Sequence, residues 1–366
     1  MKYIDEYRSP EIIEKYISAI NRMATDKWNI MEICGGQTHA IFRFGLDRLL
    51  PHRINLLHGP GCPVCVTPAE LVDKAIHLSL QPDVILCTFG DMMRVPGSGS
   101  DLMQARSHGA DIRIVYSPLD AIDIARQKDG NSVVLFAIGF ETTAPLIASV
   151  ILTAQKLGLG NLSILNGMVR IPPAIESLLN NPNSRIDALL APGHVCTVSG
   201  YTEYENISDE YKIPIVVTGF EPLDLVQGIY MAVAQLEMGD TRTVNQYSRA
   251  VYRGGNVQAR KTIDDVFDIT DGEWRGLGLI NNSGYALKDV FRQFDAETKF
   301  DISIPLAGNH KSCLVPEVLQ GLARPNQCPE FGKACTPEHP LGPMMVSSEG
   351  SCAAYYKNRS AYAAGK

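Results

Sequence analysis

Nine cysteines carry the most reactive chemistry of this sequence, and four of them gather near its C-terminus. These four are separated by 14, 6 and 16 residues in a region rich in proline and glycine: Cys313, Cys328, Cys335 and Cys352. Four thiolates on loops can surround a compact metal centre. Zinc accepts four thiolates, but its structural sites usually contain two close C-x-x-C-type pairs. A [4Fe–4S] cluster accepts more dispersed ligands, so the spacing favours a cluster and leaves zinc open.

A second motif, Cys62-Pro63-Val64-Cys65, follows an apolar run and precedes a helix expected to begin near residue 68. A helix N-terminus favours the thiolate, and two cysteines at this spacing form a reversible disulfide readily. The motif therefore predicts a redox dithiol. Half of a zinc site is the alternative, with Cys34 and either His39 or His58 as the further ligands.

Cys34 and His39 belong to a third motif, Cys-Gly-Gly-Gln-Thr-His, which also follows an apolar run. Its two glycines allow a bound group to approach the backbone, and a thiol beside an imidazole suits a nucleophile or a soft metal site. Cys87 lies inside an apolar run, so we expect it in the core. The position of Cys196 also favours the core.

Apolar runs that end in glycine or proline, each followed by a helical pattern, predict an α/β protein with buried parallel strands. The eight expected strands are residues 28–34, 54–57, 83–89, 112–116, 132–138, 161–165, 187–191 and 213–218. We expect two Rossmann-like lobes, residues 1–125 and 126–228, each with four consecutive strands. Residues 229–366 are expected to form a helical and loop-rich cluster domain. One helix is expected over 223–238, across the domain boundary, and a second over 243–252.

The distinctive polar residues follow the predicted strands. Ligands of open α/β sheets bind beyond the carboxyl ends of the strands, so one crevice is expected to contain Cys34, Cys62, Cys65, Asp91, Glu141 and His194. Taken singly, Asp91, Glu141 and His194 are more often helix caps or hydrogen-bonding groups than catalysts. Their shared location makes them candidates.

Composition excludes several classes of function. The 366 residues carry a net charge of −7 without any cluster of Lys and Arg, which argues against a nucleic-acid or anionic-membrane partner. No apolar run is long enough to span a bilayer, and the N-terminus has no signal-peptide pattern. We therefore expect a cytoplasmic protein, in which nine cysteines indicate metal or redox chemistry and not a disulfide framework.

Five motifs together resemble the hydrogenase maturation protein family HypD. They are Cys34-Gly-Gly-Gln-Thr-His39, Gly59-Pro-Gly-Cys62-Pro-Val-Cys65, Gly139-Phe-Glu-Thr-Thr-Ala-Pro145, Pro192-Gly-His194-Val, and the late cysteine array that ends in Ser348-Glu349-Gly350-Ser351-Cys352. The resemblance extends from about residue 28 to 356, nearly the whole chain.

This resemblance implies a scaffold on which the Fe(CN)₂CO group of [NiFe]-hydrogenase is assembled together with the small chaperone HypC. Cyanide would come from HypE and its partner HypF. The late cysteines would bind a [4Fe–4S] cluster, and Cys34 would bind the transient iron together with a cysteine of HypC. Cys62 and Cys65 would pass electrons between cluster and iron by thiol–disulfide exchange. Such a protein is a redox-active assembly scaffold more than a turnover enzyme.

Four further residues are candidates for surrounding the iron site or handling protons: His39, Asp91, Glu141 and His194. Glu349, close to Cys352 in the sequence, is a candidate for tuning the cluster or protonating a group near it. Two other functions remain open. One is a cluster-dependent thiol–disulfide oxidoreductase that works through Cys62 and Cys65 and needs no iron at Cys34. The other is a structural zinc protein that docks other maturation factors.

Overall fold

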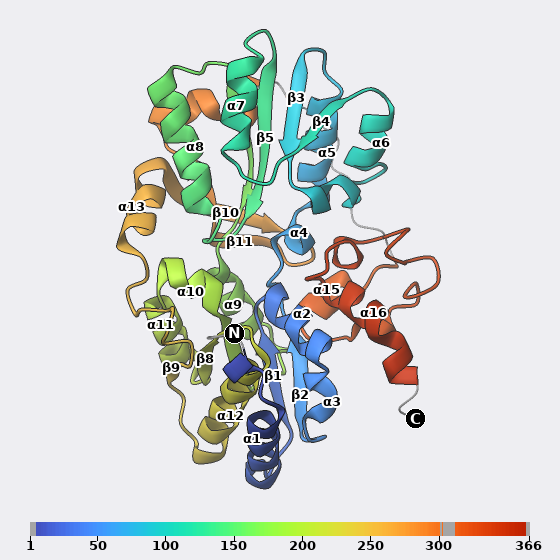
Figure 1. The fold of residues 1–366 in the computed structure, drawn as a ribbon, viewed down its shortest axis with the longest axis vertical. Helices are drawn as coiled ribbons and strands as arrows, with labels where there is room; N and C mark the ends of the chain where they lie inside the picture. Colours follow the sequence, from blue (N-terminus) through green and yellow to red (C-terminus); the bar gives the residue numbers. More distant parts are fainter. Residues whose placement is uncertain (1–4, 301, 303–311, 364–366) are drawn as a thin grey trace.

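All eight predicted strands are present in the computed structural model, which describes residues 5–300, 302 and 312–363. They form two parallel sheets, placed one above the other in Figure 1, and the expected α/β class is confirmed. We call the parts built on these sheets the lower and the upper lobe. Parallel strands require crossover connections, and helices of both lobes supply them.

The lower lobe has the strand order β2-β1-β7-β8-β9. Its strands are β1 (Trp28–Glu32), β2 (Ile54–His58), β7 (Ala188–Pro192), β8 (Ile215–Thr218) and β9 (Thr243–Asn245). Its helices are α1 (Pro10–Met23), α2 (Gly35–Phe44), α3 (Leu46–Leu49), α9 (Ile171–Leu179), α10 (Gly193–Ser199), α11 (Thr202–Tyr211) and α12 (Pro222–Met238), with a 3-10 turn η1 (Asp5–Tyr7) before them.

The upper lobe has the strand order β4-β3-β5-β6. Its strands are β3 (Val84–Thr88), β4 (Asp111–Ile114), β5 (Ser132–Gly139) and β6 (Leu162–Met168). The helices around it are α5 (Ala69–Ser79), α6 (Leu102–Ser107), α7 (Asp120–Gln127), α8 (Ala144–Leu157) and α13 (Val257–Val266), with the 3-10 helix η2 (Gly90–Arg94).

Each sheet has cores on both faces, because side chains alternate along a strand. In β7, Ala188 and Leu190 face the core shared with α1 and α12, whereas Leu189 faces the core that also contains Cys62, Cys65 and Cys196. In β3 of the upper lobe, Cys87 is completely buried in one of the two cores, as expected. Burial on both faces explains why the strands are continuous apolar runs in the sequence.

The two sheets are not built from four consecutive strands each. β1 pairs with β7, and β7 pairs with β8, so the lower sheet joins the beginning of the chain to residues 188–218. The chain crosses to the upper lobe after β2 through the short helix α4 (Pro63–Val66) and returns through α9. Strand grouping depends on long-range pairing, which the local apolar pattern does not encode.

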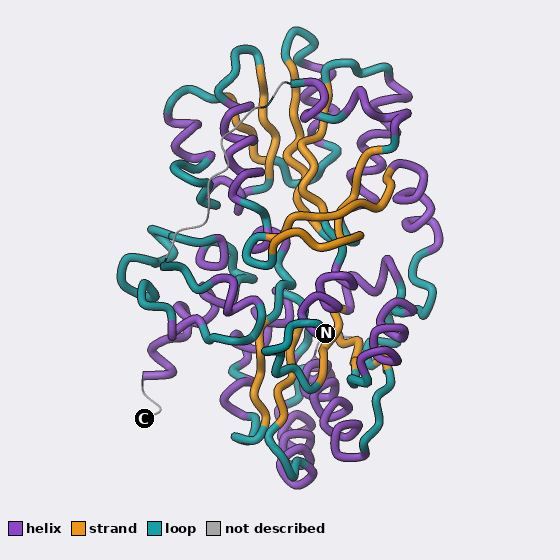
Figure 2. The backbone as a smooth tube through the Cα atoms, turned by 180° about the vertical axis from the view of Figure 1, so that it is seen from behind, coloured by secondary structure: helices purple, strands orange, loops and turns teal. Residues whose placement is uncertain are grey.

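An antiparallel hairpin and the C-terminal segment lie where the two lobes meet. The hairpin consists of β10 (Phe267–Trp274) and β11 (Gly278–Leu287), and Figure 2 shows it crossing the molecule between the sheets. The remaining elements are η3 (Asp289–Phe294), α14 (Ala296–Lys299), α15 (Val315–Leu319), η4 (Pro325–Gln327), η5 (Pro343–Met345) and α16 (Ser351–Ala363). The segment that contains α15 and α16 lies beside α2 and α4 (Figure 1).

One helix of the sequence prediction was wrong. The helix over residues 223–238 is confirmed as α12, but residues 243–252 form the edge strand β9 and a turn. Thr243 and Val244 are β-branched and pair with Ile215 and Val216 of β8, and this pairing outweighs the weak helical pattern. Within the described part of the chain, no helix has the length and apolar character needed to cross a membrane.

Candidate functional site

Cys34 lies immediately after β1, at the N-terminus of α2, as predicted. Its backbone is held by the loop that follows β2, since the Gly35 N–H donates to the Gly61 carbonyl at 2.8 Å. A side chain at position 61 would place its Cβ 2.2 Å from the Cys34 nitrogen. Only glycine permits this approach, so the loop that leads into Cys62 also fixes Cys34.

Gly61→Ala is therefore expected to push this loop away from Cys34. Its methyl group would meet backbone atoms, which cannot rotate aside, and overpacking of this kind costs about 1–3 kcal/mol of unfolding free energy. Urea unfolding measures the loss. Gly99→Ala is the matched control, because nothing lies within 4 Å of the added methyl group. Equal stability of the two variants would contradict the close approach.

Glu32, which the sequence analysis missed, organises the loops around Cys34. This carboxylate is completely buried in β1. It accepts hydrogen bonds from Thr38 at 2.7 Å and from the Gly59 N–H at 3.2 Å, and it pairs with His58 at 2.5 Å. Buried carboxylates need such partners. The signal was a glutamate inside the largely apolar run 28–34.

Glu349 reaches the Cys34 site from the C-terminal segment. A Cβ at Gly35 would lie 2.5 Å from the Glu349 Cβ and 3.0 Å from its Oε2, so the carboxylate lies against the start of α2. Next to it, the His39 Nδ1 lies 3.2 Å from the Ser348 carbonyl oxygen. Partial burial and the nearby Asp91 carboxylate raise the pKa of Glu349, and His39 opposes this shift. Cys34, His39, Asp91 and Glu349 therefore share one neighbourhood.

The Cys34 thiol holds its proton in this environment. Burial is the main cause and the Glu349 charge adds to it, so that the pKa of Cys34 is raised to about 12. The N–H groups of Gly36 and Gln37 favour the thiolate but do not outweigh these effects. A cation that binds this sulfur must therefore displace a proton.

His194 approaches the same site through an aromatic ring. It lies in the first turn of α10 and stacks on Phe220, with ring centroids 3.6 Å apart and planes 19° apart. Phe220 also lies against Gly36, where a Cβ would lie 3.2 Å from the ring. Phe220 thus fills the space between His194 and the Cys34 helix. Partial burial lowers the pKa of His194, which favours the neutral imidazole.

Cys62 and Cys65 form a disulfide in the structure, with a sulfur–sulfur distance of 2.26 Å. Cys62 caps α4, and the Cys65 N–H donates to the Cys62 sulfur at 3.2 Å. The two side chains are only 4% and 1% exposed. This pairing fits the predicted dithiol and places it inside the core between the lobes.

The four late cysteines line one cavity. The rest of its wall is mostly apolar and includes Leu314, Val315, Val318, Phe331, Met344 and Met345. The Leu341 N–H donates to the Cys335 sulfur at 3.4 Å. Burial, followed by the neighbouring cysteines, raises the pKa of Cys352 far above its ordinary value. The segment before Cys313, residues 303–311, lies outside the described residues.

The donor set of this cavity fits an iron–sulfur cluster. Four cysteines, an N–H donor to sulfur and an apolar wall are features of such sites. Within the described residues, no group of three or more His, Cys, Asp or Glu side chains is arranged to hold a metal ion. The four cysteines nevertheless line one shared cavity.

Residues 343–352, which we call the bridging segment, connect the three cysteine sites. Its first part, η5, packs against α4 of the dithiol and contributes Met344 and Met345 to the four-cysteine cavity. Its turn carries Glu349 to Gly35, beside Cys34. It ends at Cys352, in the helix α16 that packs on α2. Arg94 of η2 donates to the Val346 carbonyl at 3.4 Å and anchors the segment to the upper lobe.

Glu141 lies apart from this group. Its side chain is 3% exposed, its Oε1 accepts the Ile171 N–H at 2.9 Å, and its Oε2 has no hydrogen-bond partner. It lines a cavity of about 170 Å³ together with Arg170, Glu203 and Tyr285. Cys196 is completely buried, as expected. Burial raises its pKa, and the charges of Glu141 and Cys34 add to this shift.

The stability of the protein should depend on the protonation of Glu141. Burial raises its pKa from 4.5 to about 7. A carboxyl whose folded pKa is raised favours the folded state most below pH 4.5, and this advantage is lost as the pH rises to 7. Glu141→Gln is neutral at every pH and still accepts the Ile171 N–H, so at pH 8 it should be more stable than the parent by about 3 kcal/mol.

Urea unfolding at pH 5 and pH 8 tests this difference. The exposed Glu11→Gln in α1 is the control and should follow the pH dependence of the parent protein. Suppose the free energy of unfolding of Glu141→Gln does not rise relative to the parent between pH 5 and pH 8. Glu141 would then ionise without a cost in stability.

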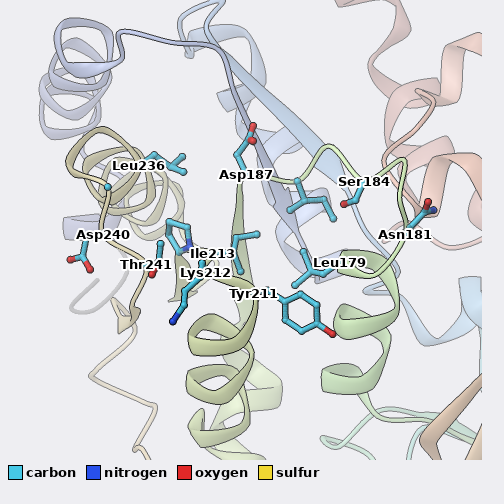
Figure 3. A pocket seen from close by; sticks show the side chains of 13 residues that line it. Leu179, Asn181, Ser184, Asp187, Tyr211, Lys212, Ile213, Leu236, Asp240 and Thr241 are labelled. Atoms are coloured by element: carbon cyan, nitrogen blue, oxygen red, sulfur yellow. The ribbon is translucent and has the colours of Figure 1, made fainter.

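A larger cavity lies at the ends of the lower-sheet strands that are opposite to the cysteine sites. It measures about 460 Å³ and is formed at the amino ends of β7 and β8, where Asp187, Tyr211, Lys212 and Asp240 line it (Figure 3). Sites of open α/β sheets form at the opposite, carboxyl ends. The cysteine sites follow the carboxyl ends of β1 and β2, so the chemistry gathers there and not at this cavity.

Comparison with known proteins points to one family. The model of the HypD family, described as "Hydrogenase formation hypA family", matches residues 11–359. Hydrogenase maturation factor HypD2 of Bradyrhizobium diazoefficiens is 46% identical over 97% of this chain and 96% of its own length. Hydrogenase maturation factor HypD of Rhodobacter capsulatus is 45% identical over 100% of both chains, and that of Escherichia coli K12 is 44% identical over 98% of both.

Proposed function

Since this chain belongs to the HypD family of hydrogenase maturation factors, we propose that it is a scaffold for assembling the Fe(CN)₂CO group of [NiFe]-hydrogenase. Its cargo iron binds Cys34 together with a thiol of a HypC-type chaperone. A HypE-type protein, charged by a HypF-type partner, delivers cyanide. The protein acts in the cytoplasm, with neither nucleic acid nor membrane as a partner.

The observation that carries this proposal is the bridging segment, residues 343–352. One short stretch of chain touches the dithiol helix α4, lines the four-cysteine cavity and places Glu349 beside Cys34. A protein that only displayed cysteines for a structural metal would not need to join them in this way. The arrangement suits a site where iron is bound and its ligands and thiols are kept reduced.

Cys34 supplies the cargo site with a soft ligand. Low-spin Fe(II) with cyanide and CO prefers thiolate, and the partly buried position of Cys34 limits access of water. The thiol must lose its proton when iron binds, because its pKa is about 12. Glu349 and His39 lie beside it and are the groups proposed to receive this proton. His194 and Asp91 are the further residues proposed to surround the iron.

Cys313, Cys328, Cys335 and Cys352 would hold the resident [4Fe–4S] cluster, which supplies electrons singly when bound. The chain's own step is the opening of the Cys62–Cys65 disulfide. This consumes two electrons and two protons and gives two thiols, and the electrons originate from an external low-potential donor. The packing of α4 on η5 brings this disulfide next to the wall of the four-cysteine cavity.

Infrared spectroscopy of the anaerobically purified complex with a HypC-type chaperone tests the proposal. We expect CN and CO stretching bands in the parent complex and none in Cys34→Ala. Cys87→Ala removes a cysteine from the upper-lobe core and should keep the bands. Bands that persist without Cys34 would contradict the assignment of the cargo site.

A thiol–disulfide oxidoreductase is the second candidate, favoured by the disulfide at Cys62 and Cys65. Such an enzyme would open disulfides of other proteins, and the burial of both sulfurs argues against this use. It would lack the infrared bands altogether and turn over a protein disulfide in the absence of the chaperone. Metal analysis of the same sample identifies the third alternative, since a structural zinc protein would contain zinc in place of iron and sulfide.

A further inference from the structure

The two glycines that follow Cys34 each lie against a side chain from a distant part of the chain. At Gly35, a Cβ would lie 2.5 Å from the Glu349 Cβ. At Gly36, a Cβ would lie 3.2 Å from two ring carbons of Phe220 and 3.7 Å from the Cys34 sulfur. The ring and the sulfur therefore both border the space that a side chain at position 36 would fill. The glycine pair gives Phe220 and Glu349 room beside the sulfur.

Contacts with two other rings hold Phe220 in this place. His194 stacks on it, and Tyr247 meets it at an angle of 80°, with ring centroids 6.3 Å apart. Aromatic rings favour both stacked and edge-to-face pairing. Tyr247 itself has little space, because a Cβ at Gly193 or Gly219 would lie only 2.7 or 2.8 Å from its ring. Phe220 is therefore held in position by its packing.

An ion pair with a buried carboxylate fixes Tyr247 in turn. The Arg249 guanidinium lies over the Tyr247 ring, 4.5 Å from its centroid, and over the Tyr7 ring at 3.9 Å. Both of its terminal nitrogens donate to the Asp224 carboxylate, at 2.7 and 2.5 Å. Asp224 is completely buried in α12, and a bidentate pair of this kind restricts the orientation of both partners. The rings beside Cys34 are thus anchored to the framework of the lower lobe.

We propose that Phe220 is a specificity-determining residue, which closes one side of the Cys34 sulfur and limits the size of the molecules that can bond to it. An iron ion and a diatomic ligand such as cyanide are small enough for this site, whereas thiols and disulfides with bulky substituents collide with the ring. The benzene ring offers no ligand atom, so it does not compete with Cys34 for iron. The inference deepens the proposed function and rests on it, because it sets the ligand size of the proposed cargo site. A partner thiol approaches from a side that Phe220 leaves open.

Alkylation of Cys34 in the purified full-length protein, without iron or partner, tests the inference. N-ethylmaleimide and N-pyrenylmaleimide share one reactive group and differ in size. The sulfur adds to the double bond of either reagent, and its proton goes to the neighbouring carbon. Peptide mass spectrometry follows Cys34 alone, and each rate is divided by that of cysteine in solution. Phe220→Ala should accelerate the reaction with the pyrenyl reagent about tenfold, because it removes the collision from the activation free energy, and should change the reaction with the ethyl reagent little.

Two further variants make this result specific. Phe220→Tyr keeps the ring and should react like the parent protein with both reagents. Tyr116→Ala removes an aromatic side chain that is 96% exposed in the upper lobe, and it should change neither rate.

Gly36→Ala provides an independent test should Phe220→Ala fail to fold. Its methyl group would enter the space that the ring and the Cys34 sulfur border, and it should slow the reaction of Cys34 with both reagents. Unchanged rates in Gly36→Ala or in a folded Phe220→Ala would overturn the inference. The absence of infrared bands from the parent complex with the chaperone would instead contradict the proposed function, so the two failures are distinguishable.

Discussion

Cys352→Ser is expected to abolish both the iron–sulfur absorption and hydrogenase maturation. Cys352 lies in the first turn of α16, lines the same cavity as the other three late cysteines and also ends the bridging segment. Serine is a poor ligand for iron compared with thiolate, and replacing partners that only support a metal ligand already costs about 10–100-fold in affinity or activity. Loss of a ligand itself should reduce maturation to the level of cells without this protein.

Iron and sulfide analysis, the visible spectrum and hydrogenase activity in a complemented deletion strain measure these effects. Cys87→Ala is the matched control, because Cys87 is completely buried but lies in the upper-lobe core among Ile85, Val133 and Leu135. It should keep metal and activity. Full maturation by Cys352→Ser would refute a functional role for the four-cysteine cavity.

Cys65→Ser should also stop maturation, but with the cluster retained. The substitution removes the dithiol and changes little else, because serine is of similar size and the site tolerates one buried hydroxyl at a cost of about 1–3 kcal/mol. The cysteines of the cavity remain in place. Activity should fall to the deletion level while iron and sulfide contents stay at those of the parent.

The comparison of spectrum and activity in one sample makes this prediction specific. Val64→Ala, in the same short helix, is the control and should retain both, since it leaves Cys62 and Cys65 unchanged. A Cys65→Ser protein that matures hydrogenase normally would show that the disulfide is structural. Loss of the iron and sulfide together with activity would show that α4 supports the cluster and has no redox role of its own.

Local pattern in the sequence predicted the strands and the residues that follow them. Each strand is buried on both faces, so an uninterrupted apolar run marks it, and glycines mark the loops of Cys34 and Cys62. Cys34, Asp91 and His194 follow the carboxyl ends of strands, and His39 and Glu349 lie near Cys34. Glu141 also follows the carboxyl end of a strand, β5, but it lines another cavity.

Contacts between distant segments could not be predicted from the sequence. Glu349 lies against Gly35 because the C-terminal segment returns to α2, and no local pattern records this return. The pairing of β1 with β7 is equally remote in the chain. Arg275, in the turn between β10 and β11, is buried although no local pattern marks it, since its burial depends on α4 and α15, which meet this turn only in the folded protein.

We propose that the four-cysteine site supplies electrons to the dithiol and, through it, to the Cys34 site. Differential alkylation of Cys62 and Cys65, read by mass spectrometry, tests this claim during anaerobic reduction with a one-electron viologen donor. We predict that the disulfide opens in the parent protein and stays closed in Cys352→Ser. Equal opening in both proteins would contradict the account, because the dithiol would then be reduced without any contribution from the late cysteines.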